Sequence, residues 1–311
     1  GIQSSNLLGR SWKSSLDLTY GEYGGLVNFS FTDPWIKGDK HRTSFRSRVF
    51  ISREVPQEFR SQYGGTIVDA SKGNSIFLQR TGGGFSFARF LNGGDPYLRV
   101  PWRVLAGMNV QQVNAVNYAG KSRPYGVLKG DDDIICVAYN CSDVNNLFSL
   151  TTAAIYNTLN DSKNPTSGDF LSLGTEQFIT VGDDSPTFNR LRTSYSHFFP
   201  VNLLKISKGC RSKIAKQANC PQAIGFQAKV GSIVGELPPY EAFCLGGSSS
   251  VRGWNNCDLG VARTFGEASV EYRLPIWKLI SAAFFIDGAT DFGSQSDVPG
   301  KPGSLLGKNG S

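Results

Sequence analysis

Residues 237–254 decide the fold, and they read Leu-Pro-Pro-Tyr-Glu-Ala-Phe-Cys-Leu-Gly-Gly-Ser-Ser-Ser-Val-Arg-Gly-Trp. The stretch begins apolar, becomes rich in glycine and serine, and carries a single arginine, Arg252. Two alternating runs follow at 268–274 and 282–288, and each holds one acid, Glu271 and Asp287 respectively. Because alternation of apolar and polar residues is typical of strands, we predict a loop whose arginine is held by carboxylates on a strand-built wall.

The same alternation recurs through most of the chain, broken by turns in a sequence with 36 glycines. Each such run has one apolar face and one face polar enough to carry Arg, Lys, Asn or Gln. Helical periodicity is nearly absent, so the chain is predicted to be all-β. The runs lie at 16–20, 27–31, 45–51, 85–88, 103–111, 191–196 and 224–230.

Two features favour a membrane barrel over a soluble β-protein, although alternation fits both. Strand signals recur about a dozen times without a helix, which is more than one sandwich uses. Aromatic residues also gather near strand ends, as in the interfacial girdles of membrane barrels. The residues concerned are Tyr20, Tyr23, Trp35, Tyr97, Trp102, Phe198, Phe199 and Trp277. Four long polar connections, at 56–74, 130–146, 160–167 and 207–221, are expected to be surface loops.

The net charge of +7 comes from scattered basic residues and not from a stripe, so we expect no nucleic-acid partner. Six cysteines form three close couples, Cys136/Cys141, Cys210/Cys220 and Cys244/Cys257. Pairing within each couple is the simplest of about 15 possible connectivities, and unpaired small apolar residues are the alternative. No metal is expected, because the spacing fits no zinc site and the chain holds only two histidines.

A family resemblance lies in Gly246-Gly247 followed by Val251-Arg252-Gly253-Trp254. This stretch resembles the sixth extracellular loop of BamA-type outer-membrane insertases, which include plastid Toc-type and mitochondrial Sam-type channels. That family more often has Tyr or Phe at the position of Trp254. A second family pattern, Phe-x-Asp-x-Gly on a late strand, matches Phe285, Asp287 and Gly288. The resemblance spans nearly the whole chain and is strongest over 237–303.

The resemblance implies a transmembrane antiparallel β-barrel with about sixteen strands in the intact protein, of which about fourteen are expected here. Residues 1–311 would form one barrel domain, with POTRA repeats upstream. Because 291–311 are polar and an open edge is costly in lipid, closing strands are expected to be missing. Loop six would fold into the lumen, where Arg252 pairs with Glu271 and Asp287. A Cys244–Cys257 disulfide would pre-order its tip.

The implied function is an insertase or translocation channel that assembles outer-membrane proteins. Its expected partners are unfolded outer-membrane protein substrates, membrane lipids and accessory assembly proteins. Its expected location is a cyanobacterial outer membrane or a plastid outer envelope. Alternatives are a polypeptide secretion or import pore of the same superfamily, a passive porin, and a soluble β-rich binding protein. No cofactor and no catalytic residues are predicted, because the chain holds no nucleophile–base arrangement and no phosphate-binding loop.

Overall fold

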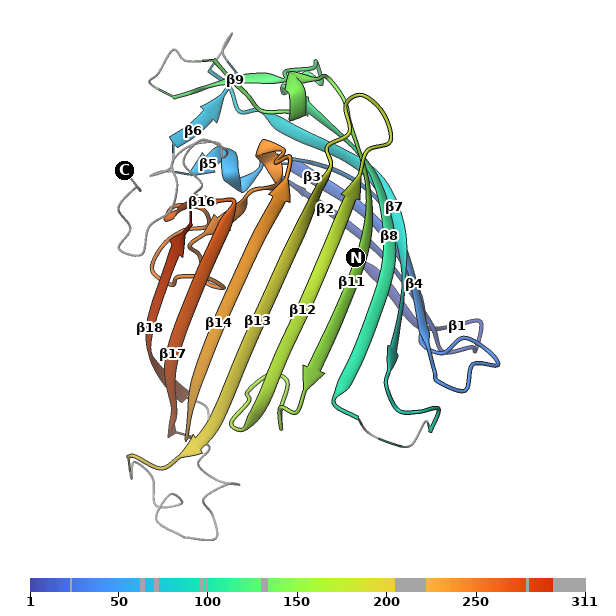
Figure 1. The fold of residues 1–311 in the computed structure, drawn as a ribbon, viewed down its shortest axis with the longest axis vertical. Coiled ribbons are helices and arrows are strands. Elements are labelled where there is room, and N and C mark those ends of the chain that lie inside the picture. The colour runs from blue at the N-terminus through green and yellow to red at the C-terminus, as the bar shows by residue number, and fades with distance from the viewer. Residues whose placement is uncertain are drawn as a thin grey trace.

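Strands that each have one apolar and one polar face pair into one twelve-stranded antiparallel sheet among the described residues. This sheet forms the curved wall of a barrel (Figure 1). The computed structural model describes residues 1–292 except 23, 62–64, 70–72, 96–97, 99, 130–133, 205–221 and 278–279. Strands follow one another around the wall in chain order, and β1 and β18 are its two edges among the described residues. The prediction of an all-β antiparallel barrel wall is confirmed.

The twelve wall strands are β1 (Ile2–Leu7), β2 (Trp12–Gly21), β3 (Gly24–Asp33), β4 (Ser44–Glu54), β7 (Phe77–Phe90), β8 (Trp102–Val116), β11 (Asn145–Asn157), β12 (Gly168–Ile179), β13 (Phe188–Val201), β14 (Gln222–Gly235), β17 (Thr264–Trp277) and β18 (Ile280–Asp291). Short strands pair outside the wall: β5 (Arg60–Ser61), β6 (Gly65–Val68), β9 (Tyr125–Leu128) and β10 (Ile134–Cys136) in one sheet, and β15 (Phe243–Leu245) with β16 (Gly260–Ala262) in another. The described residues also form the 3-10 turns η1 (Gln57–Phe59), η2 (Tyr139–Cys141) and η4 (Pro239–Glu241).

The two faces of the wall differ because side chains alternate along each strand. Phe226, Val270 and Ile286 are paired in one row across β14, β17 and β18, and all three are exposed. The neighbouring row, Gln227, Ser269 and Asp287, points the other way. Large apolar side chains of the outer face are 39–81% exposed, as a lipid-facing band requires. They include Val49, Ile51, Phe85, Phe87, Val110, Leu150, Leu173, Leu191, Phe226, Val230, Val270, Phe284 and Ile286.

The predicted aromatic girdle is only partly present. Tyr20, Trp35, Trp102 and Phe199 are exposed, whereas Phe198 is 3% exposed and faces the interior. Phe198 pairs with Gly225 on β14, and a Cβ on that glycine would lie 2.5 Å from the Phe198 ring. Consecutive strand residues point to opposite faces, so a Phe-Phe pair cannot place both rings in lipid. Tyr23, Tyr97 and the side chain of Trp277 fall outside the described part.

The connections 56–74 and 130–146 are not simple surface loops, which corrects that expectation. The first contributes Phe59 and Ile67 to the largest apolar cluster, at 0% and 1% exposure. That cluster fills the barrel interior at the end where β14 leaves the wall. It also takes residues from the inner faces of β7, β8, β11, β12, β13 and β14 and from the chain between β14 and β17. This end of the barrel therefore holds a packed apolar cluster.

Among the described residues the wall has twelve strands, where about fourteen were expected from the family resemblance. The connection between β4 and β7 and the one between β8 and β11 contain four of the six described strands that pair apart from the wall, and β15 and β16 are the other two. Pairing partners cannot be read from a strand's own pattern, since alternation shows a pleated segment and not its neighbour. No helix in the described part of the chain is both long enough and apolar enough to cross a membrane.

Candidate functional site

The chain between β14 and β17, which we call the 236–263 loop, carries the Val-Arg-Gly tip. Strands β15 and β16 pair at its stem, and the disulfide Cys244–Cys257 ties the two sides together with a Cα–Cα distance of 4.5 Å. Gly246 and Gly247 have φ angles of 105° and 97°, a region that disfavours any residue with a Cβ. A Cβ on Gly246 would lie 2.7 Å from the backbone oxygen of Asn255. The double glycine therefore lets the chain turn back on itself.

The tip arginine is held by β17 and β18, in an arrangement we call the latch: Arg252, Ser269, Glu271 and Asp287. The Nε and Nη2 atoms of Arg252 donate to the two carboxylate oxygens of Asp287, each at 2.7 Å. Its Nη1 donates to Glu271, and its Nη2 also donates to the hydroxyl of Ser269 at 3.0 Å. The backbone N–H of Arg252 donates to Asp287 at 3.0 Å. One guanidinium thus bridges two strands, a geometry that lysine cannot reproduce.

The latch lies on the inner face of the wall. Glu271 pairs with Phe285 and Ser269 with Asp287, and the residues of opposite direction, Val270 and Ile286, belong to the apolar outer band. The guanidinium of Arg252 lies 3.6 Å from the centroid of the Phe285 ring. Phe285 and Asp287 of the late-strand pattern therefore both contact the loop, while Gly288 alternates to the outer face.

Burial gives the latch its strength. The side chain of Asp287 is 3% exposed, that of Glu271 is 10% and that of Arg252 is 26%. Exposed ion pairs contribute about 0–1 kcal/mol, whereas removing one partner of a buried pair costs about 3–5 kcal/mol. Hydrogen bonds to Asp287, and then to Glu271, raise the pKa of Arg252 and keep it charged. Arg273 also donates to Glu271, so that this acid is shared by two cations.

Serines of the tip make further hydrogen bonds to the wall. The hydroxyl of Ser250 accepts the backbone N–H of Gly246 at 3.0 Å and donates to Glu267 on β17. Lys229 on β14 lies 3.4 Å from the other oxygen of Glu267 and donates to the carbonyl of Ser249. The tip is therefore tied to three adjacent strands, β14, β17 and β18.

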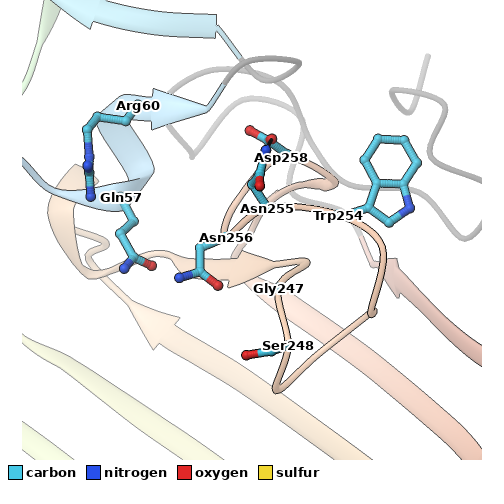
Figure 2. A pocket seen from close by; sticks show the side chains of 8 residues that line it. All are labelled: Gln57, Arg60, Gly247, Ser248, Trp254, Asn255, Asn256 and Asp258. Atoms are coloured by element: carbon cyan, nitrogen blue, oxygen red, sulfur yellow. Dashed lines mark hydrogen bonds between the residues drawn. The ribbon is translucent and has the colours of Figure 1, made fainter.

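A polar cavity of about 570 Å³ lies between the tip and the η1–β5 connection. Figure 2 shows Gln57 and Asn256 facing one another across it, with Ser248 on the side of the tip. Trp254, the last residue of the motif, lines the same cavity and packs against the main apolar cluster. Val251 is 7% exposed and belongs to that cluster, so it anchors the side of the tip opposite the guanidinium.

The base of the loop is attached by residues that no sequence motif singles out. Glu241 in η4 accepts hydrogen bonds from Arg80 on β7 and from Arg190 on β13. Burial by itself would raise the pKa of Glu241, but the charges of Arg190 and Arg80 outweigh it and lower that pKa to about 2. Tyr240, which is 2% exposed, donates its hydroxyl to Asn145 on β11 at 3.0 Å. Tyr240 and Glu241 belong to the segment 237–254, but the pattern of that segment does not identify their partners.

Two of the three predicted cysteine couples are disulfides in the structure, Cys136–Cys141 and Cys244–Cys257. Cys210 and Cys220 lie outside the described residues. Among the residues that the structure describes, no group of three or more His, Cys, Asp or Glu side chains is arranged to hold a metal ion.

Replacing both Cys244 and Cys257 with serine is expected to loosen the tip without releasing it. The bond closes a loop of sequence separation 13, and such a bond contributes about 2–4 kcal/mol by restricting the open state. The latch remains in the variant, so we expect amide exchange in residues 247–253 to rise less than in Arg252→Ala. Hydrogen–deuterium exchange measures this, with the Cys136→Ser/Cys141→Ser variant as the matched control. Equal exchange in all three variants and in the parent protein would contradict the prediction.

The fold and the site together define a class of protein: an outer-membrane β-barrel whose lumen holds an arginine-tipped loop fixed to its own wall. The chain belongs to the Omp85 superfamily, because residues 6–311 match the model of the Omp85 superfamily domain. It is accordingly an outer-membrane protein.

Known relatives agree with this assignment. Outer envelope protein 80, chloroplastic, of Arabidopsis thaliana is 27% identical over 98% of this chain and 36% of its own length. Protein TOC75-3, chloroplastic, of the same plant is 33% identical over 43% of this chain and 15% of its own length. BamA from Haemophilus ducreyi has the same fold, with a TM-score of 0.62 at 16% identity over 93% of this chain and 53% of that one. The chain spans 36% and 40% of the length of the outer envelope protein 80 relatives from Arabidopsis thaliana and rice, respectively.

Proposed function

We propose that this barrel is the membrane part of a machine that inserts outer-membrane proteins, and that its 236–263 loop works docked inside the lumen. The latch is the observation that supports this proposal most. It fixes a loop to β17 and β18 through Asp287, whose side chain is 3% exposed, and through Glu271. A passive porin needs a water-filled lumen, whereas the interior here is packed with apolar side chains at the end from which the loop enters.

The substrates in this proposal are unfolded outer-membrane proteins, and lipids surround the apolar outer band. Accessory assembly proteins and upstream POTRA repeats belong to the same proposal. So does the membrane: the relatives named chloroplastic outer envelope proteins favour a plastid outer envelope or its cyanobacterial counterpart. The protein is a channel or insertase in this proposal and not an enzyme.

Reconstitution tests the function directly. The full-length protein is placed in liposomes, and a urea-denatured outer-membrane barrel protein is added. We expect the substrate to fold into the bilayer faster than in liposomes holding an unrelated porin, measured by the gel mobility shift of folded barrels on heating. Substrate protected from protease inside the vesicles but not folded in the bilayer would favour a secretion or import pore. Neither folding nor protection would overturn both readings.

A further inference from the structure

The base of the 236–263 loop is fixed by a charge cluster separate from the latch. Nη1 of Arg80 lies 2.7 Å from Oε1 of Glu241, and Arg190 donates to the other carboxylate oxygen. The Glu241 side chain is 7% exposed, and the side chains of Arg80 and Arg190 are 19% and 10% exposed. Carboxylates are almost never buried to this extent unless they are paired, so the contact is a built one.

The two arginines come from distant parts of the wall. In the sheet order β7-β8-β11-β12-β13, Arg80 and Arg190 lie four strand steps apart. At about 4.8 Å per step, that is roughly 19 Å along the wall. Both guanidinium groups nevertheless meet one carboxylate, which is possible only because the curved sheet brings its inner faces together around Glu241. Segment 238–241 therefore extends across the interior from the end of β14 toward β7.

Tyr240, the residue before Glu241, strengthens the attachment of the loop base. Arg80, Val113 and Asn145 form one row of directly paired residues across β7, β8 and β11. Both ends of this row hold Tyr240: Nη2 of Arg80 donates to its carbonyl at 3.3 Å, and Asn145 accepts its hydroxyl at 3.0 Å. The Arg80 guanidinium also lies 5.3 Å from the centroid of the Tyr240 ring. Asn145 is fully buried, so water cannot replace this partner.

Glu241 is the carboxylate that Arg80 and Arg190 share. Without it, Arg190 keeps Glu176, at 4.0 Å, as its ion-pair partner among the described residues, and Arg80 loses its hydrogen bond to Glu241, with Glu58 as a remaining acidic neighbour. The side chain of Arg190 is restricted in its motion, because its guanidinium packs against Phe178 and Phe188, whose rings are stacked with centroids 4.0 Å apart. Loss of the carboxylate would leave confined cations facing each other, and the loop base would move away from them.

We propose that Glu241 is a positioning residue that seats the base of the 236–263 loop across the barrel and keeps the lumen closed to ions, independently of the latch. This inference rests on the proposed function in one respect: the proposed function assumes that the loop stays docked in the barrel. Two anchors then divide the loop: the latch orients the tip against β17 and β18, and Glu241 fixes the base between β7 and β13.

Single-channel recording of the full-length protein in planar bilayers tests this proposal. We expect Glu241→Gln to raise the open probability at least about tenfold, since a tenfold change needs only about 1.4 kcal/mol and a broken buried ion pair exceeds that. Arg80→Gln should raise the open probability less than Glu241→Gln does, because Glu241 keeps its ion pair with Arg190. The matched control is Glu236→Gln, the same change in an exposed acid of the same loop, which accepts a backbone N–H of Thr187 and should record as the parent protein.

Hydrogen–deuterium exchange separates the two anchors. The backbone amides of residues 240–242 should exchange faster in Glu241→Gln and at the parent rate in Arg252→Ala. Heat-modifiable gel mobility checks that each barrel is folded. If Glu241→Gln does not fold, Arg80→Gln replaces it as the test variant. Parent-like closure and exchange in the folded variants, or an equal effect in Glu236→Gln, would overturn the proposal. Failure of the liposome assay with parent protein would reject the proposed function instead, because the conductance readout involves no substrate.

Discussion

Replacing Arg252 with alanine is expected to release the loop tip from the wall and to impair substrate assembly strongly. The change removes four side-chain hydrogen bonds and leaves Asp287 and Glu271 confined without their shared cation. Stranding a buried charge costs about 3–5 kcal/mol, which corresponds to a shift of more than about a hundredfold toward the undocked tip. Amide exchange in residues 247–253 and the rate of substrate folding in liposomes measure the two effects.

Arg252→Lys separates charge from geometry in this prediction. Lysine keeps the positive charge but cannot donate to both oxygens of Asp287 and to Glu271 at once. We expect intermediate exchange and intermediate activity. The double variant Arg252→Ala/Asp287→Ala should be less impaired than the sum of its single variants, because Asp287 is then no longer stranded opposite a missing cation, while Glu271 keeps its ion pair with Arg273. Parent-like docking in Arg252→Ala, or full additivity in the double variant, would show that the latch does not hold the tip.

Some of this site could be predicted from sequence because its information is local. The direction of Glu271 follows from the apolar neighbours Val270 and Tyr272 on either side, since strand residues alternate. The same reasoning placed Asp287 inside. The pattern of one arginine followed by two strand-borne acids suggested that they pair, and the family resemblance added that the loop folds into the lumen to reach them, because alternation gives the face of a residue and not its partner. The close cysteine couple around the tip was likewise visible from its spacing alone.

The attachment of the loop base could not be predicted in this way. Glu241 contacts Arg80, 161 positions earlier, and Arg190, 51 positions earlier. Both arginines occur on alternating strands where a polar inner face is expected, and nothing local distinguishes them from Arg46 or Arg48 on β4. Such contacts depend on the curvature and closure of the wall, which are collective properties of all its strands. The same limit explains why the short strands of the connections could not be assigned to a separate sheet.

The outer band makes a second strong prediction: Phe29→Arg should prevent stable insertion of the barrel. Phe29 lies in the middle of β3, is 46% exposed, and pairs with Val49 on β4, which is 58% exposed. An arginine on the lipid face near the bilayer centre costs about 2–4 kcal/mol. That is a large fraction of the roughly 5–15 kcal/mol that stabilises a folded domain. The folded fraction after reconstitution, read from heat-modifiable mobility across a urea series, measures the loss.

Asn28→Arg is the matched control, because it adds the same side chain one residue away on the opposite face. Asn28 donates to Asp17 on β2 at 3.3 Å inside the barrel, so an arginine there would meet a carboxylate and not lipid. We expect it to insert as the parent protein does. An equal loss of folded fraction in both variants would mean that the added side-chain volume, and not the polarity of the face, destabilises β3. Loss in Phe29→Arg alone would show that alternation along a single strand decides which side of the wall meets the membrane, the same rule that turns Glu271 and Asp287 toward Arg252.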